Sequence, residues 1–212
     1  MDKNERVRKV PNWRVHLEIA KKLNEQIKFN DDDFNLFLLG NIAPDINNGY
    51  IVKDVSHIYD HGRTHLYKEH DGSTYVNFYD KYKEYFKTNP VIFGYFTHLY
   101  TDYLLNKAYD AKCDKNHWDK EECIKVKHKD LRKYDKKYID NTIILKDYEE
   151  AVKDLNKIEE VTIEKADISK VINFLDKKET EGDTNLEFYT FEELDKEVED
   201  ITNQIYKFIE FK

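Results

Sequence analysis

The chain has 212 residues, which is enough for one compact domain with a sizeable hydrophobic core, so a second domain is not required. Its 35 Lys and Arg against 43 Asp and Glu leave a formal net charge of −8, and both signs are mixed along the chain. This balance excludes a protein that binds long nucleic acid or anionic lipid through charge alone. Only 6 Gly and 3 Pro are present, which favours an all-α fold of long helices and short turns.

We expect neither a membrane-spanning segment nor export. The sequence contains no run of about 18 apolar residues, so we expect no integral membrane segment. The first residues, "MDKNERVRKVPNW", lack the apolar core of an export signal. The 2 Cys are too few for a disulfide framework. We therefore expect a soluble, cytoplasmic protein.

The first predicted helix runs from Trp13 to about Ile27, where apolar residues follow the period of an amphipathic helix. His16 falls on the buried face of this helix. The acidic residues 31–33 suit the start of a second, short apolar helix that ends at a glycine. The loop that follows delivers Asp45.

Residues 46–72 are polar and rich in histidine, and they predict a loop with short helical turns. A helix with aromatic residues on one side is predicted over 73–87. Asn89 can then cap a new helix, and Pro90 suits its first position. This helix continues to about Tyr109 and is the most apolar in the chain.

The remainder of the chain is highly charged, with helices predicted near 119–134, 135–156 and 167–178, and a linker at 177–185. Thr190 and Glu193 fit a capping box at the start of the final helix. Apolar residues then recur at intervals of three and four: Phe191, Leu194, Val198, Ile201, Ile205 and Phe208. This face is interpreted as a strap that packs on the core, with a homodimer seam as the alternative.

His98 and Asp102 are polar residues in the middle of the most apolar helix, where burial requires that each has a partner. Since they are four apart, they could satisfy one another. His16, Asp45 and the histidines of residues 57–70 also fall where the core would be apolar, however. Imidazoles and carboxylates that converge in this way are typical of a divalent metal site, and the lack of thiolates suits zinc, iron(II) or manganese(II).

Four segments of the first half, "PNWRVHLEIA", "LLGNIAPD", "RTHLY" and "GYFTHLYTD", resemble in order and spacing the bacterial zinc-dependent phospholipase C family. S1/P1-type nucleases share the fold of that family. The resemblance implies one all-α, multi-helix metal-binding domain over 1–212, with a charged helical extension from about 147. It also implies two zinc ions and five ligands: His16, Asp45, His65, His98 and Asp102. Asp45, His65 and His98 would hold one ion, His16 would hold the other, and Asp102 would bridge them.

The sequence departs from the family pattern at two places. In the family, a tryptophan at the mature N-terminus binds metal through its own amine and carbonyl, whereas Trp13 is internal here. The family's third ion takes two histidines and a glutamate. His117 and Glu121 have the spacing of the last two, but no histidine lies between Asp102 and His117. We therefore expect two ions, or only one.

Two choices of ligand stay open at this point. His65 follows a threonine and precedes an apolar residue as in the family, but His57 and His61 are alternatives from the same segment. A second arrangement with ligand-like spacing consists of Cys113, His117, Cys123 and His128. Its five central residues leave little room for the fold-back of a structural zinc site, so a charged surface segment is the preferred interpretation.

The chemistry expected of such a site is hydrolysis of a phosphate ester by a metal-activated water, with Asp102 as the bridging carboxylate and Asp45 as the base. Neighbours that could orient the imidazoles are Asn41, Thr97 and Thr101. The expected substrate is a small phosphodiester or phosphomonoester, or a phospholipid headgroup, rather than long nucleic acid.

Two alternative functions remain. An HD-type phosphohydrolase would use the dipeptide His70–Asp71, which sits in a polar turn and leaves His98 without a role. A metal-stabilised helical module without catalysis would instead bind a partner, for which the charged C-terminal half is available.

Overall fold

The computed structural model describes residues 13–49, 52–67, 74–136, 143–176 and 186–210, and every regular element in these ranges is a helix. This confirms the predicted all-α class. The elements are α1 (Trp13–Ile27), α2 (Asp31–Gly40), α3 (Ala43–Ile46), α4 (His61–Thr64), α5 (Thr74–Tyr82), the short 3-10 helix η1 (Lys83–Tyr85), α6 (Pro90–Lys115), α7 (Lys120–Asp135), α8 (Tyr148–Leu155), α9 (Lys165–Leu175) and α10 (Phe191–Glu210). None of the helices in the described ranges is long and apolar enough to cross a membrane.

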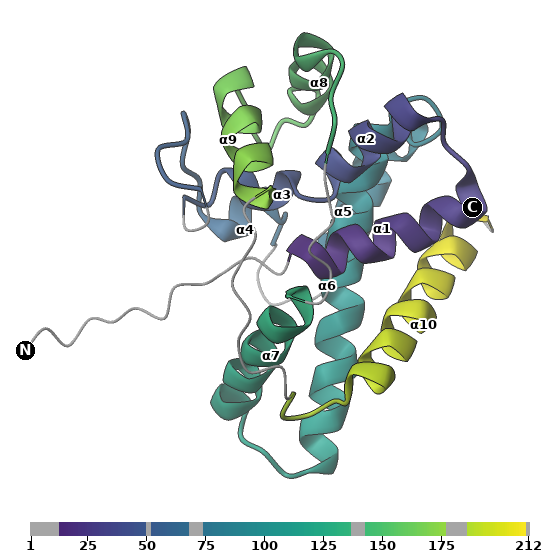
Figure 1. Cartoon of the computed structure of the whole chain (residues 1–212), viewed down its shortest axis with the longest axis vertical. Coiled ribbons are helices and arrows are strands. Elements are labelled where there is room, and N and C mark those ends of the chain that lie inside the picture. Colours follow the sequence, from purple (N-terminus) through teal and green to yellow (C-terminus); the bar gives the residue numbers. More distant parts are fainter. Residues whose placement is uncertain (1–12, 50–51, 68–73, 137–142, 177–185, 211–212) are drawn as a thin grey trace, which may run out of the picture.

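Helix α6 runs through the middle of the molecule, and α1, α2, α5, α7 and α10 pack around it (Figure 1). It begins as predicted, because the side chain of Asn89 accepts a hydrogen bond from the amide of Ile92 (3.0 Å) and Pro90 occupies the first turn. It continues past the predicted end at Tyr109 to Lys115. The extra turns carry the buried Cys113, which faces α7. The buried side of the helix is therefore longer than predicted.

The contact between α2 and α6 depends on two glycines. A Cβ atom placed on Gly94 would lie 2.2 Å from the carbonyl oxygen of Phe37, and one on Gly40 would lie 2.1 Å from that of Val91. Both neighbours are backbone atoms, which cannot move aside as a side chain can. The two helices therefore approach closely enough to bring the carbonyl of Asn41, directly after α2, to the side of α6 that carries His98.

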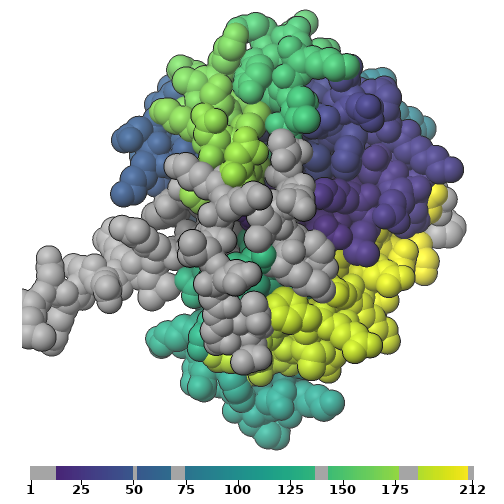
Figure 2. Space-filling model, viewed as in Figure 1, coloured from purple at the N-terminus to yellow at the C-terminus, as the bar shows by residue number. Residues whose placement is uncertain are grey.

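The C-terminal helices share the core of the N-terminal half. Thr190 and Glu193 form the predicted capping box, with reciprocal hydrogen bonds of 2.8 and 3.1 Å. The apolar stripe of α10 is buried against α1 and α6 of the same chain, and the hydrophobic core extends from Trp13 to Ile205. In the space-filling view α10 covers the lower part of the molecule beside α1 and α6 (Figure 2).

The prediction of one helix over 135–156 was wrong. Helix α8 begins only at Tyr148, where the side chain of Asp147 accepts from the two following amides and thus starts a separate helix. Residues 143–147 are not helical, and the β-branched Ile143 is buried in the core. The predicted linker at 177–185 lies outside the described residues. The predicted loop at 46–72 is confirmed in its described parts, with α4 as its short helical turn. Asp45, which was predicted in a loop, lies instead in the short helix α3.

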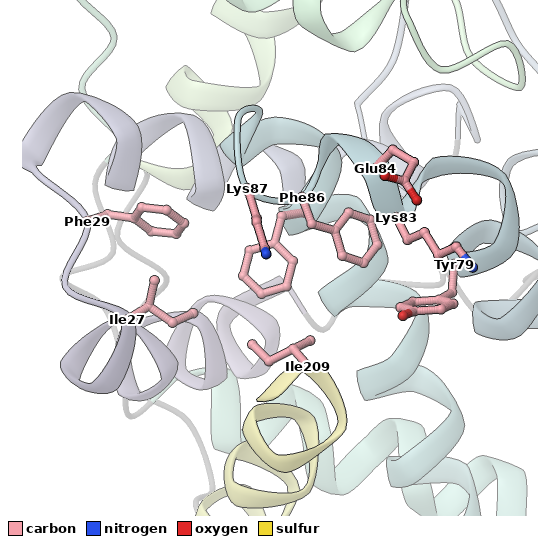
Figure 3. Close-up of a pocket in the computed structure, with 9 residues that line it drawn as sticks. Ile27, Phe29, Tyr79, Lys83, Glu84, Phe86, Lys87 and Ile209 are labelled. Atoms are coloured by element: carbon pink, nitrogen blue, oxygen red, sulfur yellow. The ribbon is translucent and has the colours of Figure 1, made fainter. Parts of the chain in front are cut away.

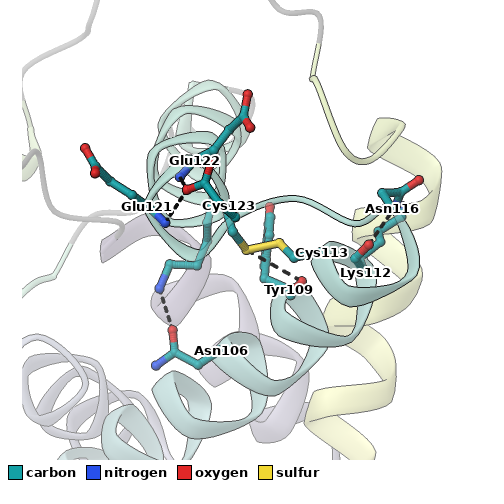
Figure 4. The surroundings of a disulfide bond; sticks show 10 residues. Asn106, Tyr109, Lys112, Cys113, Asn116, Glu121, Glu122 and Cys123 are labelled. Carbon is teal, nitrogen blue, oxygen red and sulfur yellow. Dashed lines mark hydrogen bonds between the residues drawn. A yellow bond between two sulfur atoms is a disulfide. The ribbon is translucent and has the colours of Figure 1, made fainter.

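A disulfide joins Cys113, near the end of α6, to Cys123, in α7 (Figure 4). The two cysteines are too few for a framework of several disulfides, but they form this one, because the turn between the two helices folds the thiols onto each other. Neither sulfur is available as a thiolate, so the alternative zinc arrangement with His117 and His128 does not form. Disulfides are rare in cytosolic proteins. The bond therefore argues against the expected cytoplasmic location, which stays a prediction.

Removing this disulfide is expected to destabilise the fold without changing the histidine cluster. In the Cys113→Ala/Cys123→Ala variant the free energy of unfolding should fall by about 3 kcal/mol, because the bond closes a short loop in the unfolded chain. For a chain of this size the melting temperature should fall by roughly 6 to 10 °C. Calorimetry measures this, and wild-type protein treated with reductant is the control that should show the same loss. Equal melting temperatures with and without reductant would contradict the prediction.

Candidate metal centre

The five residues predicted as ligands meet in one place, although they come from separate parts of the chain. His16 lies on α1, Asp45 on α3, and His65 directly after the last residue of α4. His98 and Asp102 project from α6 itself. His16, His65 and His98 are buried, with 4%, 2% and 1% of the side chain exposed.

Asp102 is the centre of this cluster. Its carboxylate oxygens lie 3.3 Å from Nε2 of His16, 3.4 Å from Nε2 of His98 and 3.5 Å from Nε2 of His65. His98 and Asp102 are thus close, as their spacing on α6 requires. They are not an isolated pair, however, because one carboxylate meets three imidazoles.

The far sides of two imidazoles are fixed by backbone carbonyls. Nδ1 of His98 lies 2.7 Å from the carbonyl oxygen of Asn41, and Nδ1 of His65 lies 3.2 Å from that of His61 and 3.0 Å from the Thr64 hydroxyl. A carbonyl only accepts hydrogen bonds, so the neutral ring carries its proton on Nδ1 and a lone pair on Nε2. The two Nε2 atoms then face each other at 3.3 Å. Two facing lone pairs beside carboxylates are unfavourable unless a cation lies near them.

Asp45 is held from behind by two donors. The indole Nε1 of Trp13 donates to Oδ2 (3.1 Å), and the side-chain amide of Asn48 donates to Oδ1 (2.7 Å). The same two oxygens face Nε2 of His98 at 3.9 Å and Nε2 of His65 at 3.8 Å. The internal Trp13 therefore positions a carboxylate through its side chain.

The charges of the cluster are mutually dependent. Burial alone would raise the pKa of Asp102, but His98, His16 and His65 hold it well below its usual range. Burial would likewise lower the pKa of His98, and the Asp102 carboxylate outweighs this and raises it. The pKa of His16 is lowered by burial and by the neighbouring His98. The cluster therefore holds an ionised carboxylate among imidazoles, of which His16 stays neutral.

One buried atom in this cluster has no hydrogen-bond partner. Nδ1 of His16 is shielded from solvent, and no group in the described ranges bonds to it. If His16 donates Nε2–H to Asp102, Nδ1 is an unsatisfied acceptor; in the other tautomer, Nδ1–H is an unsatisfied donor and the Nε2 lone pair faces the carboxylate. A divalent ion at Nε2 removes the conflict at Nε2 and leaves the one at Nδ1. Imidazole nitrogens and carboxylate oxygens without thiolate suit Zn²⁺, Fe²⁺ or Mn²⁺, so the residues present fit such ions.

The segment 57–65 places its three histidines differently. His65 is the one that reaches Asp102, in agreement with the prediction. His57 is paired with Glu164 at 3.6 Å. His61 lies against His65, with ring centroids 3.6 Å apart, and its ligand atom lies within 4.8 Å of those of Asp45 and His65. His61, an alternative that the sequence left open, thus lies beside His65, four residues before it in the chain.

The predicted neighbours of the imidazoles are confirmed only in part. Asn41 orients His98, but through its backbone carbonyl. Thr97 donates to the carbonyl of Phe93 within α6 (3.0 Å), so it does not orient an imidazole. The hydroxyl of Thr101 has no hydrogen-bond partner in the described residues. Thr64, one residue before His65, is the threonine that contacts a ring.

A third ion has no support in the described residues. His117 and Glu121 are both exposed, and Glu121 pairs with Lys125 at 2.7 Å. His70 and Asp71, the dipeptide required for an HD-type enzyme, lie outside the described residues. The cluster around Asp102 forms without them.

An open cavity of about 470 Å³ adjoins the cluster. His65 and Asp102 form one end, and Tyr67 and Tyr103 stand beside them. Its walls continue along α6, with residues of both charges: Asn106, Lys107, Asp110, Ala111 and Asp114. Burial and the carboxylates of Asp102 and Asp45 raise the pKa of Tyr67, which keeps this phenol neutral. The cavity has room for a small polar molecule in contact with the predicted ligands.

A second cavity, of about 660 Å³, lies where α1 and α10 end and is mainly apolar (Figure 3). Ile27, Phe29, Phe86 and Ile209 line it, and lysines stand at its edge. No residue of the histidine cluster reaches it. Its lining offers no set of converging polar groups, so we do not place the site there.

Comparison with known proteins identifies no relative of this chain. The chain matches no protein-family model, no curated protein and no solved structure.

Proposed function

We propose that the chain is a metal-dependent phosphoric ester hydrolase, similar to the zinc-dependent phospholipases C. The observation that carries this proposal is the meeting of one carboxylate, Asp102, with the Nε2 atoms of three buried histidines. Divalent ions held by these residues and Asp45, with zinc the first choice and iron or manganese the alternatives, would neutralise a phosphoryl group and lower the pKa of a water molecule.

The residues of the chain have separable roles in this proposal. His16, His65 and His98 present their Nε2 atoms, and Asp102 supplies the shared negative charge. Asp45 is the second carboxylate, and the hydrogen bonds from Trp13 and Asn48 fix its direction. We assign Asp45 as the proton acceptor of the reaction, because it is partly open to solvent and faces the same space.

The cavity beside the cluster supports a small substrate. Tyr67 and Tyr103 line the cavity together with three carboxylates, Asp102, Asp110 and Asp114, against one lysine, Lys107. An acidic wall repels a polyanion, so long nucleic acid is disfavoured. A phosphodiester or phosphomonoester with a small organic group, including a phospholipid headgroup, fits the volume and polarity.

The experiment is a metal analysis of the purified protein, combined with assays on an aryl phosphodiester and an aryl phosphomonoester. We expect two divalent ions per chain, hydrolysis of at least one ester, loss of activity with a chelator, and recovery with Zn²⁺. Protein without metal that also fails to bind added metal would overturn the proposal. Bound metal without hydrolysis of either ester would point to the non-catalytic binding module.

Trp13 is expected to affect the activity although it does not face the substrate. The Trp13→Phe variant keeps an aromatic ring against Phe174 but loses the hydrogen bond to Asp45. Because partners behind a metal ligand set its direction, we expect metal affinity or activity to fall by roughly 10- to 100-fold. Zinc titration and ester hydrolysis measure this. Trp118→Phe is the matched control, since Trp118 packs on Phe188 away from the cluster and should leave both quantities unchanged.

A further inference from the structure

The ligand assignment implied by the phospholipase resemblance leaves one ion short of ligands in this chain. With Asp45, His65 and His98 on one ion, the other has only His16 and the shared Asp102. The family makes up this deficit with a terminal amine, but Trp13 lies in a chain that continues before it, and its indole is bonded to Asp45. Catalytic zinc sites usually have three protein ligands. The inference that follows therefore rests on the proposed function and concerns how its ligands are divided.

The side chains themselves form two groups of three. In the first group, the ligand atoms of His16, His98 and Asp102 all lie within 4.8 Å of one another. The rings of His16 and His98 are stacked, with centroids 4.0 Å apart and an angle of 9° between their planes. Both Nε2 atoms consequently face the same carboxylate, at 3.3 and 3.4 Å.

The second group contains a histidine that the family pattern does not use. The ligand atoms of Asp45, His61 and His65 also lie within 4.8 Å of one another. His65 connects the groups, since its Nε2 lies 3.5 Å from Asp102. The two groups share no residue, so each could hold one ion while Asp102 stays near both.

The backbone holds His61 in this position. Asp60 caps α4 by accepting from the amide of Arg63 (3.1 Å), and the amide of His65 donates to the carbonyl of His61 (3.0 Å). The guanidinium of Arg63 donates to the carbonyl of Glu160 (3.1 Å), which fastens the turn to the segment between α8 and α9. His61 and His65 are four apart in this turn, so their rings lie on one side of it.

We propose that His61 is a sixth metal ligand, which completes one ion site with Asp45 and His65 while His98 serves the other ion with His16 and Asp102. Asp102 is then the carboxylate shared between two sites with three protein ligands each. The division differs from the family's, and it compensates for the missing terminal amine.

The test counts ions in four proteins by mass spectrometry under native conditions, after loading with Zn²⁺: wild type, His61→Ala, His61→Gln and His57→Ala. We expect two ions in the wild type and in His57→Ala. His57 is the control because it belongs to the same segment but pairs with Glu164. Both His61 variants should keep one ion and bind the second at least roughly 100-fold more weakly in zinc titrations. Circular dichroism checks that each variant is folded.

The outcomes separate this inference from the proposed function. Two tightly bound ions in both His61 variants would overturn the role of His61 and leave the phosphoesterase proposal intact. A wild-type chain that binds no ion would overturn both. His16→Ala should keep the ion that Asp45, His61 and His65 hold. The double variant His16→Ala/His61→Ala should lose this ion as well. If the double variant loses no further ion compared with His16→Ala, the division into two groups is wrong.

Discussion

Replacing Asp102 with Asn is expected to remove metal and phosphoesterase activity together. The substitution keeps the size of the side chain but removes the charge that three imidazoles face. Ions stabilise the charge of such a reaction by several kcal/mol, so the rate should fall by roughly 10³-fold or more. Zinc titration and the ester assays measure the two losses.

The matched control for this variant is Asp80→Asn, which makes the same chemical change at an exposed position of α5. It should bind metal and hydrolyse esters like the wild type. If Asp102→Asn retained both ions and full activity, Asp102 would not be the shared carboxylate. A loss of activity with unchanged metal content would restrict Asp102 to a role in catalysis.

The second large effect is expected from Gly94→Ala. Helix propensity alone would make this substitution stabilising by about 1 kcal/mol. The added methyl, however, would lie 2.2 Å from the carbonyl oxygen of Phe37, and forcing α2 and α6 apart should cost about 3 kcal/mol. The net effect should be a fall in melting temperature of several degrees, measured by calorimetry.

The same variant should weaken metal binding, which connects the fold to the site. Separating α2 from α6 moves the carbonyl of Asn41 away from Nδ1 of His98, so zinc affinity should fall by roughly 10- to 100-fold. The control is Ala108→Gly, which removes a methyl group from the same helix instead of adding one. It should cost only about 1 kcal/mol and leave metal affinity unchanged. A Gly94→Ala variant more stable than the wild type would show that the helices are not in close contact.

Local signals in the sequence were sufficient for most helix starts. Asn89 and Thr190 cap the helices for which they were predicted to do so, because a cap depends only on residues within one turn. The burial of His16 followed from helical periodicity, and that of His98 from the apolar character of its whole helix. Asp102 was expected in the interior for the same reason, but 32% of its side chain is exposed. The pairing of Cys113 with Cys123 did not follow from a local signal, since it depends on how α6 and α7 turn towards each other.

The arrangement of the site was only partly predictable. The residues that meet at Asp102 were proposed from the resemblance of four segments to a known family, whereas the way in which their partners orient them was not predicted. Asn41 acts through a backbone carbonyl, and Trp13 acts through its indole across 32 positions of sequence. Contacts of this kind depend on the packing of whole helices, which no local pattern encodes. The helix predicted over 135–156 was wrong because Asp147 caps a separate helix that begins at Tyr148, a local signal that the sequence analysis did not use.

Anomalous diffraction at the zinc edge, from crystals of the zinc-loaded protein, tests whether His98, Asp102 and the residues around them bind metal. We predict peaks at coordination distance, about 2.0 to 2.2 Å, from a carboxylate oxygen of Asp102 and from Nε2 of His98. Residues of four separate segments would then share bound cations. Zinc-loaded crystals without such a peak, in which His98 and Asp102 simply hydrogen-bond to each other, would show that there is no metal centre at Asp102.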